Sequence, residues 1–368
     1  MGRIGIVCYS LAGGGAERMA VHLAREFNTA GFMVDFLLAK REGEFLEKVC
    51  EDFNVFSAAA SGARNWRLLI QGYIQDYSPS VLLGMMEGSS VIACQAARRS
   101  QKPCPVIARI PNHFSRHCRE SLRWKERWLM PLAARFYFSR VKHVIAISDG
   151  VRDDIILSAR LRPENVSTIY NPVLLNGYTS QKGSVDDPWL LPAPGWISVV
   201  TAGRLCKQKQ QEILIEAIAL ANQVSSTRLL VLGKGERESE LKNLCRELQI
   251  EDRVKFMGFV ENPSLYIEKY DVFVLSSAWE GFGNVLVEAL FSGTAVVSTD
   301  CPSGPSEILA SGRFGQLVPV GDSQAMSDAL IRAKTYPVDK AALNQHLQMF
   351  ESKYVAKQYL QVMGLETP

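Results

Sequence analysis

The chain has 368 residues, of which 47% are hydrophobic and 21% are charged. This composition is ordinary for a soluble globular protein, and the length predicts two domains of roughly 150 to 200 residues each. No run approaches the ~18 apolar residues of a membrane span, so a transmembrane protein is excluded. The eight cysteines are scattered and form no CxxC pair, which favours a reduced cytosolic protein over a disulfide scaffold or a zinc site.

The charge is distributed unevenly along the chain. Residues 1–172 contain 23 Lys and Arg against 16 Asp and Glu, whereas residues 173–368 contain 18 against 22. The overall formal charge is only +3. This asymmetry indicates that the first half meets an anionic partner.

The first half alternates between apolar strands and helices. Strands are expected at 3–8, 32–38, 80–85, 106–110, 144–147 and 167–172. A helix is expected from Ser90 to Arg99, and Ser148 and Asp149 are expected to cap a helix that starts at Gly150. This alternation predicts a doubly wound parallel sheet. The loop after the first strand holds three consecutive glycines, residues 13–15, which do not fit the GxGxxG fingerprint of a dinucleotide-binding domain. A nicotinamide or flavin cofactor is therefore disfavoured, although Asp35 on the second strand could imitate the ribose-binding acid of that fingerprint.

The second half repeats the architecture without repeating the sequence. Strands are expected at 196–201, 228–232, 254–257, 272–275 and 295–298. We expect a first Rossmann-like domain over 1–172, a linker over 173–195 and a second Rossmann-like domain over 196–345. Residues 340–363 have a helical pattern and no strand to pair with, so we expect 346–368 to pack back on the first domain.

The most informative stretch is 278–290, which follows the strand at 272–275. Glu280 lies in a loop, and Glu288 lies on the first turns of a helix expected to begin near Asn284. The loop glycines Gly281 and Gly283 present backbone N–H groups at a helix N-terminus, where an anion is favoured. Two carboxylates that accept bonds from hydroxyls, beside a phosphate cradle, suit a sugar nucleotide.

Positive charge is expected after the first strand of the second half. Arg204 and Lys209 follow Gly203 there. Because ligands of open α/β sheets bind at the carboxyl ends of strands, these side chains should face the same cleft as Glu280. Together they would neutralise a diphosphate and the charge that grows on it as a glycosyl bond breaks.

Six motifs in order make the chain resemble the retaining glycosyltransferases of group 1 (family 4), which have the GT-B fold. They are the Gly-Gly-Gly-Ala-Glu loop at 13–17, Tyr-Asn-Pro at 170–172, Gly-Arg-Leu…Lys at 203–209, Gly-Lys-Gly at 233–235, Gly-Phe-Val at 258–260, and Glu-x7-Glu at 280–288. The resemblance runs nearly from end to end. It implies two Rossmann-like domains facing a central cleft, with a C-terminal helix that crosses back to the first domain.

The resemblance also implies roles for individual residues. Arg204 and Lys209 would grip the donor diphosphate, Glu288 would bond the ribose hydroxyls, and Glu280 would contact the transferred sugar. Other donor contacts are implied for backbone groups of the glycine loops, the base-binding segment and the helix start, at Gly14, Gly15, Gly203, Gly233, Phe259, Val260, Gly281, Phe282, Gly283, Asn284 and Val285. Gly14 and Gly15 would let the backbone of the first domain approach both the diphosphate and the acceptor.

One departure concerns the acceptor side. Many members of the family have a histidine shortly after the strand that ends near Ile110, and Pro111 stands in its place here. Asn112 or His113 would substitute for it, or Arg109 would take part of its role. These three residues are the acceptor-side candidates.

The implied reaction retains the anomeric configuration, and the leaving diphosphate itself helps to take the proton of the acceptor. The chain has no Asp-x-Asp pair to hold a divalent metal on the diphosphate, so we expect no metal or other cofactor. Arg204 and Lys209 would neutralise the diphosphate in place of a metal. The expected donor is a UDP-sugar that supplies a hexose or an N-acetylhexosamine.

The segment 116–142 is basic and aromatic. Its cations outnumber Glu120 and Glu126, and tryptophan, leucine and phenylalanine side chains are interleaved with them. This pattern is typical of a surface that lies on an anionic membrane. A pair of ordinary helices with a solvated basic face would show the same pattern. No nucleic-acid-binding motif accompanies it, which disfavours nucleic acid as a partner.

The leading hypothesis is therefore a hexosyltransferase of bacterial surface glycan synthesis. It would act on a lipid-linked saccharide, in the cytoplasm or on the cytoplasmic face of the inner membrane. The alternatives are a nucleotide-sugar epimerase or a phosphorylase of the same fold, and a non-catalytic glycan- or nucleotide-binding module. No acid/base pair for epimerisation is recognisable, and phosphorylases need a far longer chain.

Overall fold

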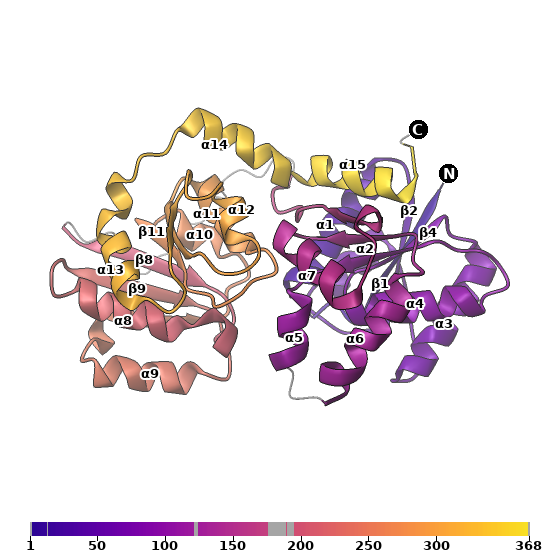
Figure 1. The fold of residues 1–368 in the computed structure, drawn as a ribbon, viewed down its shortest axis with the longest axis horizontal. Coiled ribbons are helices and arrows are strands. Elements are labelled where there is room, and N and C mark those ends of the chain that lie inside the picture. Colours follow the sequence, from indigo (N-terminus) through magenta and orange to yellow (C-terminus); the bar gives the residue numbers. More distant parts are fainter. Residues whose placement is uncertain (1, 13, 121–123, 176–188, 190–194, 367–368) are drawn as a thin grey trace. The chain divides into compact units, whose positions relative to one another are not determined.

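A computed structural model of the chain describes residues 2–12, 14–120, 124–175, 189 and 195–366 (Figure 1). It divides into two units, Met1–Asn176 with Met349–Pro368, and Gly177–Gln348. Most of the linker expected over 173–195 lies outside the described residues.

The first unit is built on a parallel sheet of seven strands in the order β3-β2-β1-β4-β5-β6-β7. The strands are β1 (Arg3–Cys8), β2 (Met33–Leu38), β3 (Asn54–Ser57), β4 (Val81–Gly84), β5 (Val106–Ile110), β6 (His143–Ala146) and β7 (Val166–Thr168). The helices are α1 (Gly15–Thr29), α2 (Leu46–Asp52), α3 (Ala63–Tyr77), α4 (Glu87–Arg99), α5 (Phe114–Glu120), α6 (Trp124–Phe138) and α7 (Asp149–Ala159).

Alternation along the central strands gives this sheet two buried faces. Ile4 and Ile6 of β1 join a core with α1 and α15 (Ser352–Met363), whereas Val7 faces a second core made with α3 and α4. A doubly wound sheet needs apolar side chains on both faces because helices cover both. The C-terminal helix α15 therefore belongs to the first unit, where it packs against α1.

The second unit has a parallel sheet of six strands in the order β10-β9-β8-β11-β12-β13. The strands are β8 (Ile197–Ala202), β9 (Thr227–Leu232), β10 (Val254–Gly258), β11 (Val272–Leu275), β12 (Ala295–Thr299) and β13 (Gln316–Val318). The helices are α8 (Gln211–Ala221), α9 (Glu238–Glu247), α10 (Ser264–Ile267), α11 (Asn284–Ser292), α12 (Pro305–Ile308), α13 (Ser323–Arg332) and α14 (Lys340–Leu347). Helices α8, α9 and α13 bury their apolar sides in one core with the sheet.

Three expectations from the sequence need correction. The short edge strands β3 and β13 were not anticipated, because a strand of three or four residues shows too little alternation to be recognised. Helix α4 begins at Glu87, three residues before the expected start at Ser90. The expected continuous helix over 340–363 is interrupted between α14 and α15, where Gln348–Phe350 forms a 3-10 turn.

Asp35 has a structural role in β2. Its carboxylate accepts a bond of 2.7 Å from the Tyr73 hydroxyl and one of 3.0 Å from the Asn54 amide, and it is ion-paired with Arg3. The side chain is 1% exposed. Burial and the carboxylate of Asp35 together raise the pKa of Tyr73, so that its hydroxyl stays a donor. This acid therefore joins the sheet to α3.

Candidate active site

The donor-site candidates follow the two central strands of the second sheet. From β8 the chain winds outward through β9 to β10, and from β11 it winds the other way through β12 to β13. Ligands bind beside the point where the strand order reverses, at the carboxyl ends of the strands. Arg204 and Lys209 follow β8, and Glu280 follows β11, so the topology brings these predicted residues to the binding edge of the sheet.

Lys209 and Glu280 form an ion pair. The Lys209 Nζ lies 2.5 Å from Glu280 Oε1, and the Ser277 hydroxyl donates to the same oxygen over 2.6 Å. The exposed fractions are 19% for the lysine side chain and 7% for the glutamate. A buried charge pair of this kind needs additional hydrogen bonds to offset the cost of desolvation, and Ser277 supplies one.

Backbone bonds also join the two loops. The Ala278 N–H donates to the Gln208 carbonyl over 2.8 Å, and the Gln208 side chain donates to the Trp279 carbonyl over 2.8 Å. The Ser276 hydroxyl donates to the Lys209 carbonyl over 2.7 Å. The carboxylate and the ammonium are therefore held in one geometry by bonds between segments about 70 residues apart.

Arg204 differs from Lys209 in its surroundings. Its side chain is exposed, while its carbonyl accepts a bond of 3.0 Å from the Gln211 amide. Because the Lys209–Glu280 pair is neutral as a whole, other cations must add net positive charge beside it, and Arg204 is the one predicted to contact the diphosphate. An exposed guanidinium offers five donors, in a geometry that matches phosphate oxygens.

Two glycines let the ends of β8 and β9 approach closely. Gly233 has φ +138°, and a Cβ on it would collide with the carbonyl oxygen of Gly203. The Gly233 N–H donates to the Gly258 carbonyl over 2.7 Å, and the Gly203 N–H donates to the Leu232 carbonyl over 2.9 Å. No other residue type fits at position 233 without moving the backbone.

Helix α11 places the second glutamate. The helix begins at Asn284, as expected, after Gly283 with φ +100°. Glu288 is 4% exposed, and its Oε2 accepts a bond of 3.1 Å from the hydroxyl of Ser264, the first residue of α10. Phe259 and Val260 lie shortly before α10, and the Phe259 side chain is 53% exposed. Glu288 therefore contacts the start of α10, the helix that follows the segment for which base recognition was predicted.

A loop after β12 packs against the stretch from 280 to 284, and no role was predicted for it. The Glu280 N–H donates to the Pro302 carbonyl over 3.1 Å. Gly304 has φ +98°, and a Cβ there would collide with the carbonyl of Phe282. The Ser303 hydroxyl is buried without a hydrogen-bond partner among the described residues. The glycine–proline pair at 304–305, between β12 and α12, was the available signal.

In the first unit, the glycine loop follows the central strand β1. Gly14 caps α1 and Gly15 is its first residue, while Gly13 lies outside the described residues. The order of the first sheet reverses between β1 and β4. This loop therefore occupies the position in the first sheet that the loop from 203 to 209 occupies in the second.

Arg109 of β5 is a buried residue with defined partners. Its guanidinium donates to the Met85 carbonyl over 3.1 Å and to the Asn171 side-chain oxygen over 2.6 Å. It is 1% exposed, and the Tyr359 hydroxyl of α15 lies beside it. Arg109 thus joins the ends of three strands and α15, and contact with an acceptor stays a prediction.

His113 is paired with an acid of α7. Its Nδ1 lies 3.1 Å from Asp154 Oδ2, and the Ser115 N–H donates to the same oxygen over 2.9 Å. Burial opposes ionisation of Asp154, but the bonds from His113 and Ser115 hold the pKa of this carboxyl below its usual range. The pairing fixes the histidine ring, which is 16% exposed, whereas Asn112 is half-buried.

Glu87 is a further acid that the sequence analysis did not single out. It begins α4, directly after β4, and is 6% exposed, with one carboxylate oxygen lacking a hydrogen-bond partner among the described residues. Burial raises the pKa of Glu87, although the nearby charges of His117 and Arg109 act in the opposite direction. A buried acid at the carboxyl edge of a sheet is a common feature of functional sites.

Among the described residues, none of the helices has the length and hydropathy of a membrane span. Within the same residues, no group of three or more His, Cys, Asp and Glu side chains is arranged to hold a metal ion.

Comparison with known proteins supports the resemblance in both halves. The family model for Glycosyltransferase Family 4 matches residues 13–176, and the model for Glycosyl transferases group 1 matches residues 197–335. The chain can be superposed on HepE from Anabaena, solved with UDP and glucose, with a TM-score of 0.78 and 21% identity, over 99% of this chain and 100% of that one. A lipopolysaccharide outer core galactosyltransferase, WaaB, gives a TM-score of 0.74 at 20% identity, over 98% and 99%.

Two curated relatives are similar in sequence. An N-acetylgalactosamine-N,N'-diacetylbacillosaminyl-diphospho-undecaprenol 4-alpha-N-acetylgalactosaminyltransferase from Campylobacter jejuni is 33% identical over 191 residues, which cover 51% of this chain and 49% of that protein. The lipopolysaccharide 1,6-galactosyltransferase of Escherichia coli is 27% identical over 257 residues, which cover 68% and 64%. The chain thus spans about half the length of the first relative and just under two thirds of the second.

The two parallel sheets, the match of both family models and the structural neighbours agree on one classification. The chain has the GT-B architecture and belongs to the group 1, family 4 glycosyltransferases.

Proposed function

We propose that the chain transfers a hexose or an N-acetylhexosamine from a UDP-sugar to a lipid-linked saccharide, with retention of configuration and without a metal ion. The observation that carries this proposal is the Lys209–Glu280 pair at the switch point of the second sheet, with Glu288 buried on the adjoining helix. A cation for phosphate and two carboxylates for hydroxyls are what a nucleotide sugar requires.

The geometry suggests how the residues share the work. An ammonium has three donors. With one on Glu280, Lys209 keeps two for the donor diphosphate, and Arg204 supplies the remaining positive charge. Glu280, oriented by Lys209 and Ser277, is held to accept bonds from hydroxyls of the transferred sugar. The N-terminus of α11 adds a positive dipole end next to the phosphate. As the glycosyl bond breaks, these groups stabilise the charge on the leaving UDP.

A screen of nucleotides and their sugars tests the donor assignment. UDP and a UDP-hexose should raise the melting temperature, because a ligand that binds only the folded state stabilises it, whereas GDP and ADP at the same concentration should have less effect. Proton NMR of the product, recorded before anomers equilibrate, should show the anomeric configuration of the donor. Preference for GDP or ADP, or inversion at the anomeric carbon, would overturn the respective part of the proposal.

The lipid-linked acceptor is supported by the relatives and by one surface. The Campylobacter relative is named for a diphospho-undecaprenol acceptor, and the Escherichia coli relative for lipopolysaccharide. On α6, Leu129, Leu132 and Phe136 are 47%, 65% and 45% exposed. Arg98 and Arg140 lie over the Phe136 ring at 5.3 and 3.9 Å from its centre. We call these five residues the α6 surface.

The structure refines the basic segment expected over 116–142. The side chains of 121–128, which include Trp124 and Trp128, lie outside the described part of the chain. Phe138 is buried in the core, and Lys142 donates to the Met363 carbonyl over 2.6 Å, so neither faces a membrane. Exposed apolar side chains beside arginines are typical of segments that lie on anionic lipid at the cytoplasmic face of a membrane.

Flotation with liposomes tests the α6 surface. The chain should float with vesicles that contain anionic lipid, and Leu132→Asp should float several-fold less, because it places a like charge against the lipid and removes apolar contact. Leu157→Asp is a matched control, since Leu157 is 78% exposed on α7. A wild-type chain that stays at the bottom of the gradient, or equal loss in both variants, would contradict the assignment.

A further inference from the structure

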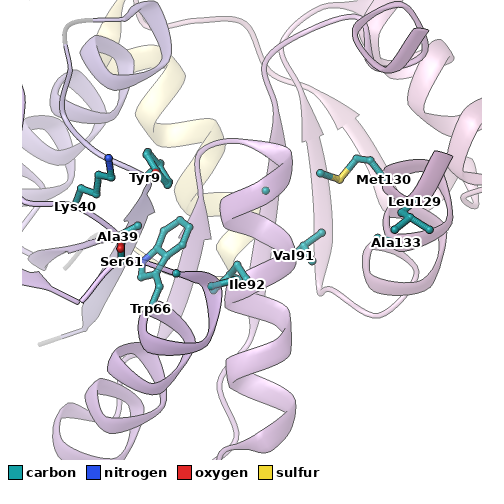
Figure 2. Close-up of a pocket in the computed structure, with 13 residues that line it drawn as sticks. Tyr9, Ala39, Lys40, Ser61, Trp66, Val91, Ile92, Leu129, Met130 and Ala133 are labelled. Atoms are coloured by element: carbon teal, nitrogen blue, oxygen red, sulfur yellow. The ribbon is translucent and has the colours of Figure 1, made fainter. Parts of the chain in front are cut away.

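The first unit contains an apolar pocket of about 400 Å³ that none of the predicted site residues lines. In Figure 2, Tyr9, Lys40 and Trp66 lie on one side, Val91 and Ile92 of α4 form the middle, and Leu129, Met130 and Ala133 of α6 lie on the other side. Every lining residue belongs to the first unit. A volume of this size is typical of a small-molecule site.

The residues that line the pocket favour a hydrocarbon ligand. The indole N–H of Trp66 donates to the Leu37 carbonyl over 3.2 Å, so it is not directed at a ligand. The Tyr9 ring lies edge-on to Trp66 with centres 6.2 Å apart, and the Lys40 ammonium lies 5.7 Å from the Tyr9 ring and 3.6 Å from Glu42. A saccharide requires several converging polar groups, because each of its buried hydroxyls must be bonded. This lining offers aromatic and aliphatic surface instead.

The pocket lies at the edge of the sheet where the chemistry is expected. Tyr9 follows β1, Ala39 and Lys40 follow β2, and Gly88 is in the first turn of α4, directly after β4. Gly14 and Gly15, the predicted diphosphate and acceptor loop, also lie between β1 and α1. A hydrocarbon in the pocket would thus be attached to a head group at the predicted acceptor site.

The pocket also continues into the α6 surface. Leu129 lines the pocket and is still 47% exposed, and Leu132 and Phe136 extend the apolar strip one and two turns along the helix. A chain that emerges past Leu129 would meet further apolar side chains and then the arginines beside Phe136. The path therefore runs from the catalytic edge to the surface assigned to the membrane.

We propose that this pocket binds the first isoprene units of a polyprenyl-diphosphate-linked saccharide. The inference rests on the proposed function, which requires a lipid-linked acceptor. An isoprenoid is favoured over the acyl chains of a lipopolysaccharide, because in a short polyprenyl-linked acceptor only a sugar or two separates the reacting hydroxyl from the diphosphate. Its chain must then begin close to the predicted acceptor site of the first unit, at the sheet edge where the pocket lies.

Gly88 allows the pocket to be filled without disturbing the backbone. A Cβ at this position meets no atom within 4 Å, and Gly88 lines the pocket. Gly72 of α3 is a matched control, because it is also a helical glycine with no atom within 4 Å of a Cβ, and it does not line the pocket. Gly88→Phe should block the site, and Gly72→Phe should leave it open.

Calorimetric titration with farnesyl diphosphate measures the pocket directly. Wild type and Gly72→Phe should bind it more tightly than inorganic diphosphate, and Gly88→Phe should bind it at least roughly tenfold less tightly than wild type, since each buried methylene is worth about a factor of four. Binding of UDP, whose predicted site is in the second unit, should be equal in all three proteins. Equal affinity of Gly88→Phe and wild type for farnesyl diphosphate would overturn the proposal, as would tighter wild-type binding of dodecyl diphosphate.

Transfer assays separate this inference from the proposed function. With a polyprenyl-diphosphate saccharide, Gly88→Phe should lose transfer mainly through a raised KM, while transfer to the same saccharide without lipid should be unchanged. If wild type shows no preference for the lipid-linked acceptor, the proposed acceptor class is wrong, and the pocket assignment fails with it. If wild type prefers the lipid-linked acceptor and Gly88→Phe does so equally, only the pocket assignment is wrong.

Discussion

Replacing Lys209 with alanine should lower sugar transfer by roughly 10²- to 10³-fold, the effect of removing one preorganised donor from a charged transition state. The variant loses the ammonium assigned to the diphosphate. It also leaves Glu280, 7% exposed, without the cation 2.5 Å away that holds it in place. Both consequences act on kcat, which would be measured at saturating UDP-sugar.

Lys207→Ala is the matched control for this prediction. Lys207 is an exposed lysine of the same 3-10 turn, Lys207–Lys209, so its loss changes the local charge equally. It should retain nearly all activity. Thermal unfolding of each variant shows whether a loss of activity reflects a loss of stability. Lys209→Met should lower the transfer rate as much as Lys209→Ala does if the charge is what matters. A Lys209→Ala enzyme that folds and keeps full activity would remove this residue from the mechanism.

Replacing Glu288 with alanine should weaken UDP binding by roughly 10²-fold, because hydrogen bonds to a charged group each contribute about 1.5–3 kcal/mol. Glu288 is 4% exposed, and its bond to the Ser264 hydroxyl orients it. The measurement is the Kd of UDP by calorimetry. Glu247→Ala, an exposed carboxylate on α9, should bind UDP as wild type does.

A comparison of nucleotides makes the test specific to the ribose. Wild type should discriminate UDP from 2′,3′-dideoxy-UDP, whereas Glu288→Ala should bind the two about equally, since the partner of the hydroxyls is gone. If discrimination persists in the variant, another residue reads the ribose. Ser264→Ala should show an intermediate loss, because the carboxylate would remain but would lose its orienting bond.

Much of the architecture could be predicted because it depends on local patterns. Apolar strands alternate with helices over both halves, and such alternation is typical of a doubly wound parallel sheet. The start of α11 at Asn284 and the Ser148 cap of α7 were expected for the same reason, since glycine and serine act within a few residues of their own position. Edge strands β3 and β13 were missed because three or four residues carry little pattern.

Residues of the candidate donor site were predicted one by one, but the contacts among them were not. Sequence reasoning placed Arg204 and Lys209 together on the diphosphate. The structure pairs Lys209 with Glu280, 71 residues away, and leaves Arg204 exposed. Ser277 and Ser264, which bond the two glutamates, were missed because a single serine in a loop or at the start of a helix has no distinguishing pattern.

The sequence by itself determined the family, the two doubly wound domains and the loops for which donor chemistry is predicted. These follow from periodicity and from short motifs, which are properties of neighbouring residues. Only the tertiary structure decided the Lys209–Glu280 pair, the burial of Arg109 and Glu87, and the pocket between α3, α4 and α6. Each of these depends on segments far apart in the chain that meet only when the sheet is assembled, so no local sequence pattern predicts them.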